Sequence, residues 1–90
     1  MIAIIRGEYY NVGYTSSCRI TAFDNNRQEL GSIPMYLGPN SFHDGFVTFH
    51  IRYDTEKFNI KVTDIVFEVY DLEDKKIPFS IKNITILNDN

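Results

Sequence analysis

The chain has 90 residues, of which 43% are hydrophobic, 14% aromatic and 23% charged, and its formal net charge is −3. This length suits one domain, and the aromatic content is too high for a disordered chain. The acidic balance argues against nucleic acid or an anionic membrane surface as the main partner. A single cysteine excludes an intramolecular disulfide framework. We therefore expect one soluble domain over residues 1–90.

Composition also indicates the fold class. Alanine, the strongest helix former, occurs twice, whereas the β-branched and aromatic residues that favour strands are abundant. This balance predicts an all-β chain in which helix is almost absent. The excess of Ile, Asn, Tyr, Phe and Lys is also what AT-rich codons produce, which suggests a low-GC source, whether bacterial, phage or another virus.

The first predicted strand spans residues 2–10 and is apolar on both faces at its start. Ile2 and Ile4 lie on one face, and Ala3 and Ile5 lie on the other. Two interpretations fit this pattern. In the one we prefer, the segment is a central strand beneath a covering layer. In the alternative, Ile2 and Ile4 belong to a strand-addition segment that pairs with the edge of another subunit.

Three more strands follow at short intervals. The second covers residues 17–24 and ends in a strong turn signal, Asp24-Asn25-Asn26. The third covers residues 28–37, where Pro34 indicates a sheet edge or a bulge. The fourth, residues 46–53, shows the clearest alternation of apolar and polar side chains.

The last two segments change phase along their length. The apolar positions of residues 58–70 switch from even to odd numbers at Thr63-Asp64, and those of residues 77–86 switch back at Lys82-Asn83. A slip of one residue exchanges the two faces of a strand, so each site predicts a bulge or a corner. About seven short strands, two of them bent, favour a small antiparallel β-sandwich or a jelly-roll-like domain.

The residues that could support catalysis do not form a recognisable set. His43 lies near Ser41 and Asp44 in a polar loop, but neighbours along the chain do not make a catalytic triad. Glu8 and Glu68 are the best candidates for paired carboxylates, and the alternation points both outward. We expect that the protein is not an enzyme.

Metal and cofactor signals are weak as well. Asp71, Glu73 and Asp74 would suit calcium, but two lysines follow at once, and a solvated hairpin tip explains them better. Cys18 lies on an apolar face and is interpreted as a small buried hydrophobe. The glycine spacings of phosphate-binding loops are absent. We therefore expect neither a metal site nor a cofactor.

Several aromatic residues remain beside the loops. Tyr10 and Tyr14 flank the first turn, while Tyr36, Phe42 and His43 accompany the longest loop. Tyrosine combines a large contact area with a polar tip, which suits recognition surfaces. These five residues form the predicted binding or interface site. The alternative, that such rings close the ends of a small sandwich, stays open.

From Cys18 onward the chain contains strand segments at residues 19–24, 29–31, 46–52, 65–70 and 79–86. This pattern resembles the galactose-binding-like jelly-roll domains, a class that includes many carbohydrate-binding modules. The resemblance implies a jelly-roll fold and glycan binding, for which Tyr14, Tyr36 and Phe42 would form a stacking platform. Those modules are usually longer and commonly offer tryptophan platforms. They often carry Asp before the Asn of the closing strand, where this chain has Lys82.

These observations lead to three functional hypotheses. The first is a non-enzymatic structural or interaction protein that docks onto a larger protein assembly or self-associates, such as a capsid-decorating or tail-associated phage subunit. The alternatives are a small carbohydrate-binding module and a phage-encoded inhibitor of a host defence protein. The sequence shows neither a signal peptide nor an apolar run long enough for a membrane helix. We therefore expect a cytoplasmic or virion-associated protein without a membrane partner.

Overall fold

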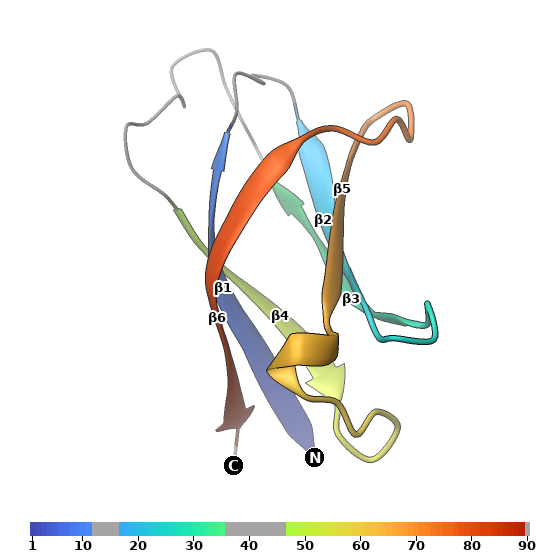
Figure 1. The fold of residues 1–90 in the computed structure, drawn as a ribbon, viewed down its shortest axis with the longest axis vertical. Helices are drawn as coiled ribbons and strands as arrows, with labels where there is room; N and C mark the ends of the chain where they lie inside the picture. The colour runs from blue at the N-terminus through green and yellow to red at the C-terminus, as the bar shows by residue number, and fades with distance from the viewer. Residues whose placement is uncertain (12–16, 36–46, 90) are drawn as a thin grey trace.

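The described part of the chain folds as a sandwich of two antiparallel sheets, each of three strands (Figure 1). The structure, a computed structural model, describes residues 1–11, 17–35 and 47–89. Sheet A has the strand order β4-β1-β6, and sheet B has the order β3-β2-β5. The strands are β1 (Ile2–Asn11), β2 (Cys18–Phe23), β3 (Glu29–Met35), β4 (Val47–Asp54), β5 (Val66–Asp71) and β6 (Phe79–Asp89). The predicted all-β class is confirmed.

The first predicted phase change is a turn that ends one segment and starts another. Residues 62–64 form a short 3-10 helix, η1 (Val62–Asp64), and β5 begins only at Val66. The Asp64 N–H donates to the carbonyl of Lys61 at 2.9 Å, and the Ile65 N–H donates to that of Val62 at 3.3 Å. Because these bonds join residues three apart, the backbone turns at the predicted corner, but residues 58–61 are not a strand, so the expectation of one bent strand over residues 58–70 is wrong.

The second predicted phase change lies inside one strand. β6 runs without interruption, but Asn83 has a φ of 56° and lies opposite a register shift between Arg6 and Glu8 of β1. The left-handed backbone at Asn83 inserts the extra residue, so the residues beyond it exchange faces. The predicted bulge at this site is confirmed.

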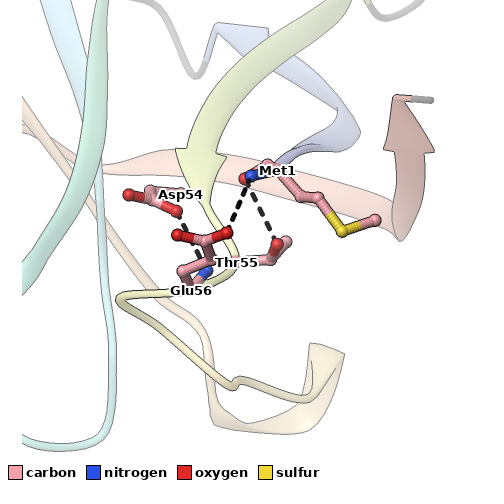
Figure 2. A network of polar contacts seen from close by, with 4 residues as sticks. All are labelled: Met1, Asp54, Thr55 and Glu56. Atoms are coloured by element: carbon pink, nitrogen blue, oxygen red, sulfur yellow. Dashed lines mark hydrogen bonds and ion pairs between the residues drawn. The ribbon is translucent and has the colours of Figure 1, made fainter.

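β1 is the central strand of sheet A. It pairs with β4 from Ile2 to Tyr9 and with β6 from Ile2 to Asn11. Figure 2 shows how the turn after β4 holds the start of β1: Thr55 donates to the Met1 carbonyl from its N–H at 3.0 Å and from its hydroxyl at 3.2 Å, and the Met1 ammonium lies 3.8 Å from Glu56.

This position decides between the two interpretations of the N-terminal segment. Both edges of β1 at Ile2 and Ile4 are occupied by strands of the same chain, so the segment has no free edge for a second subunit. The expected burial on both faces is also corrected. Ala3 and Ile5 are fully buried, whereas Ile4 is half-buried and Ile2 is 40% exposed, because only the inner face of sheet A packs against sheet B.

The core lies between the two sheets. Ile5, Ile20 and Ile51 are its largest fully buried side chains. Gly31 lets the two layers approach each other closely, because a Cβ there would lie 2.7 Å from Ile51 Cγ2 of the opposite sheet. Gly7 instead leaves room for a side chain of its own sheet, since a Cβ there would lie 2.6 Å from Phe49 Cζ of β4. The single described helix, η1, has three residues, so no described helix could span a membrane.

Candidate binding groove

The candidate site is built on the outer face of β2. Alternation along β2 turns Cys18, Ile20 and Ala22 toward the core, as the sequence predicts. The intervening residues therefore point away from the sandwich. The antiparallel register sets Arg19 between Pro34 and Tyr70, Thr21 between Ser32 and Glu68, and Phe23 between Glu29 and Val66.

A groove of about 540 Å³ follows this outer row. Arg19, Thr21 and Phe23 of β2 line it together with residues of both neighbouring strands and of the turn after β5. The lining from these neighbours includes Glu29, Pro34 and Met35 of β3, Tyr70 and Asp71 of β5, and Leu72 and Asp74 of the turn. The groove thus combines aromatic and aliphatic side chains with charges of both signs, which is a composition suited to binding.

Polar side chains beside the groove are buried although no third layer covers them among the described residues. Thr21 is 5% exposed, and its hydroxyl lies 3.1 Å from the hydroxyl of Ser32. Glu68 is 7% exposed and accepts a hydrogen bond from the Arg27 guanidinium, which lies 4.5 Å above the ring of Phe23. These contacts fix the outer row of β2 in place.

The hydrogen bond from Arg27 holds the pKa of Glu68 below its ordinary value. Partial desolvation opposes this effect, while the positive charges of Arg27 and Lys76 add to it. Glu68 is therefore an ionised, paired carboxylate at neutral pH. A general acid would need a raised pKa, so this residue serves the architecture of the face.

The turn after β5 forms one rim of the groove. The Asp71 carboxylate accepts the backbone N–H groups of Glu73 and Lys75, both at 2.8 Å, and Asp74 adopts a φ of 59°. This tight turn projects Leu72, which is 82% exposed. One Asp71 oxygen is engaged in shaping the turn, and the described residues contain no group of three potential metal ligands.

Cys18 lines one end of the groove but belongs to the core. Its side chain is 3% exposed, and burial raises the pKa of the thiol to about 11. The thiol is therefore protonated at neutral pH and is a poor nucleophile. The interpretation of Cys18 as a small buried hydrophobe is confirmed.

The other residues considered for catalysis are dispersed. Glu8 points from the outer face of sheet A, where it accepts a hydrogen bond from Asn83, and Glu68 points from the outer face of sheet B. The two carboxylates thus lie on opposite sides of the sandwich and cannot share a substrate. His43, with Ser41 and Asp44, lies outside the described residues.

Most of the binding residues predicted from the sequence are not among the described residues. Tyr14, Tyr36, Phe42 and His43 lie outside the described residues, and of Tyr10 only the backbone, opposite Ser80 in β6, is described. Their role stays a prediction. The groove uses other aromatic rings, those of Phe23 and Tyr70, which the sequence analysis did not select.

A signal for these two rings was present in the sequence. Phe23 lies out of phase with the apolar face of its strand, and Tyr70 lies out of phase with Val69. An aromatic side chain on the outward face of a predicted strand is a candidate for recognition. Their placement along one groove depends on the pairing of β2 with β5, which the alternation does not specify.

Comparison of the chain with protein-family models, with curated proteins and with solved structures finds no match. The resemblance to galactose-binding-like domains therefore stays a prediction, and the groove has to be interpreted from its own chemistry.

Proposed function

We propose that this protein is a non-enzymatic interaction protein that docks onto a larger protein assembly through the groove on the outer face of sheet B. The observation that carries the proposal is the combination of an open groove of about 540 Å³ with the exposed Leu72 at its rim. Binding clefts commonly have volumes of about 300–1,000 Å³. The exposed side chain of Leu72 does not stabilise the free protein. A partner that covers it would remove apolar surface from water and so strengthen the complex.

The charges of the groove indicate the chemistry of the partner segment. Glu29 and Asp74 supply two exposed carboxylates, and Arg19 supplies one exposed guanidinium. The apolar contacts come from Phe23 and Leu72 among others. A segment of a protein that carries an aliphatic or aromatic side chain next to Lys or Arg complements this lining. The AT-rich composition leads us to propose a phage virion, in a capsid-decorating or tail-associated position, as the assembly.

The test is selection from a random peptide library displayed at a surface, with the intact chain as the bait. We expect enrichment of peptides with a basic residue beside an apolar one. Leu72→Asp and Glu29→Lys should each weaken binding of the enriched peptides by about tenfold or more, because one removes an exposed apolar contact and the other reverses a charge.

Val62→Asp is the matched control, since Val62 is an exposed aliphatic residue of η1 outside the groove. It should bind as the unmodified chain does. Enrichment of acidic peptides, or equal losses in Val62→Asp and Leu72→Asp, would overturn the proposal. A glycan array is the second arm: saturable glycan binding that Leu72→Asp abolishes, without peptide binding, would assign the groove to a carbohydrate instead.

A further inference from the structure

One edge of β6 is not paired with any of the described strands. β6 is an outer strand of sheet A and pairs with β1 along one side, while no described strand pairs with its other side. The backbone hydrogen bonds outside the strands join turns and the start of β1, and in the described part of the chain none of them involves β6. Such a row of N–H and C=O groups is a template for another strand.

The other three outer strands carry features that discourage strand addition. β3 contains Pro34, which lacks an N–H, and β4 carries Arg52 at its exposed surface. The edge of β5 is occupied, since Lys76 forms a bridge with Tyr70 and the Ile77 N–H donates to the carbonyl of Val69 at 2.9 Å. These edges are therefore protected in three different ways.

The second half of β6 lacks proline and charge, and η1, which lies against β6, does not pair with it as a strand. Residues 84–88 contain no charge, no proline and no glycine, and Ile84, Thr85 and Ile86 are β-branched. Such a segment on an open edge favours pairing with another strand. The first half differs, because Lys82 and the left-handed Asn83 interrupt the edge there.

An apolar patch adjoins the same half of the strand. On the outer face of sheet A, Leu87 of β6 lies directly opposite Ile4 of β1 and is 44% exposed, and Ile2 is 40% exposed. A strand added beside β6 would cover part of Leu87. Neither this edge nor this patch belongs to the groove, which lies on the other sheet.

We propose that residues 84–88 of β6 pair antiparallel with the same residues of a second copy of this chain. The two three-stranded A sheets then form one continuous sheet related by a two-fold axis near Ile86. The charges favour a second copy as the occupant. Lys82 precedes the uncharged stretch and Asp89 follows it, so antiparallel pairing brings the positive end of one copy beside the negative end of the other.

The inference goes beyond the proposed function because it concerns a different surface. Each copy keeps the groove of sheet B open, so the dimer would present two grooves to a partner assembly. Failure of the dimer would leave the groove proposal intact, and failure of peptide selection would leave the dimer intact.

The first test is sedimentation of the full chain from micromolar to millimolar concentration. We expect a monomer–dimer equilibrium that is lost in Thr85→Glu. Thr85 is exposed on the outer face opposite Arg6, so the new carboxylate gains a favourable neighbour within the chain while it places a like charge on each copy at the paired edge.

Thr48→Lys is the matched control, because Thr48 is exposed on β4, the opposite edge of the same sheet, and faces Glu8. This variant should dimerise as the unmodified chain does. A chain that stays monomeric throughout the range overturns the proposal, as does a dimer that survives in Thr85→Glu or is lost equally in Thr48→Lys.

Amide hydrogen exchange of the unmodified chain makes the test independent of folding in the variants. Exchange at alternate residues of 84–88, those whose N–H points away from β1, should slow as the concentration rises. Unchanged exchange at concentrations where the dimer is present overturns the assignment of the interface to β6.

Discussion

The outer faces of the two sheets differ although both sheets have three antiparallel strands. On sheet B, Thr21 and Glu68 are buried, paired with Ser32 and Arg27, and flanked by a groove. On sheet A, the corresponding face of the central strand exposes Ile2 and Arg6 to solvent.

The difference teaches that burial on this molecule has two origins. Between the sheets, apolar side chains are buried because two layers meet. On the outer face of sheet B, polar side chains are buried because polar neighbours satisfy their hydrogen bonds: Arg27 donates to Glu68, and the hydroxyl of Thr21 pairs with that of Ser32. The first kind of burial contributes more stability, and the second contributes less while it arranges a surface.

The largest effect is expected where the two layers meet. Ile5→Ala on β1 and Ile20→Ala on β2 should each lower the free energy of unfolding by about 2–5 kcal/mol, because both side chains are completely buried and truncation leaves a cavity. Chemical denaturation measures this loss. The same change at Ile2, on the outer face of β1, should cost less than about 1 kcal/mol. Equal losses at Ile2 and Ile5 would show that a further layer covers sheet A.

A smaller loss is expected at two inward-facing glycines, Gly31 at the contact between the sheets and Gly7 within sheet A. Gly31→Ala and Gly7→Ala should each cost about 1–3 kcal/mol, since an added Cβ would overlap existing atoms. Gly31→Ala should be the worse of the two. Its Cβ would lie 2.9 Å from the backbone carbonyl of Arg52, which cannot rotate away as a side chain can. Thermal unfolding of both variants ranks them, and the reverse order would contradict this packing.

The paired charges on the outer face of sheet B should contribute less. Glu68→Gln is expected to cost about 1 kcal/mol at pH 7, because Arg27 loses its ionised partner. The folded pKa of Glu68 is lowered, so the stabilisation is complete above the unfolded pKa of about 4.3 and disappears as the pH falls through the folded value.

Denaturation at several pH values checks the sign of this effect. The difference between the unmodified chain and Glu68→Gln should shrink below pH 4. In Arg27→Met, the pKa of Glu68 should rise, which a carbon NMR titration of the carboxyl would detect. A pKa of Glu68 that is unchanged in Arg27→Met would refute the pairing.

The smallest effect is expected at the rim of the groove. Leu72→Ser should change the free energy of unfolding by less than about 0.5 kcal/mol, because the side chain is exposed in the free protein. Calorimetry provides the measurement. A loss above about 1 kcal/mol would mean that Leu72 folds into the groove and closes it, which would remove its proposed role as a contact for a partner.

Much of the strand architecture could be predicted, because side-chain alternation is a local property of the backbone. The inward positions of Cys18, Ile20 and Ala22 and the bulge at Asn83 followed from the phase of apolar residues alone. The same reasoning located the corner at residues 62–64 but was wrong about the segment before it, because residues 58–61 do not form a strand. Two apolar residues spaced as in a strand also occur in a turn that packs on the core, so this spacing alone does not predict a strand.

The candidate site was less accessible to sequence analysis. Tyr14, Tyr36 and Phe42, which the sequence suggested, lie outside the described residues, while the groove depends on Tyr70 and Phe23 lying on two neighbouring strands. The strands that contain them are separated by more than forty residues of chain, and the sequence of neither strand indicates which strand it pairs with. The strand order was not predictable for the same reason. The apolar Ile2 suggested strand addition in β1, but β1 is the central strand and its neighbour β6 is an outer strand.

The sequence by itself determined the all-β class, most strand positions and the face that each strand turns to the core, because these depend on composition and on a period of two residues. The tertiary structure decided that β1 is central, that β6 is an outer strand and that the outer residues of β2, β3 and β5 surround one groove. Strand order is set by which long-range pairs bury the most apolar surface while satisfying every backbone group. That balance belongs to the whole chain and to no single segment of it.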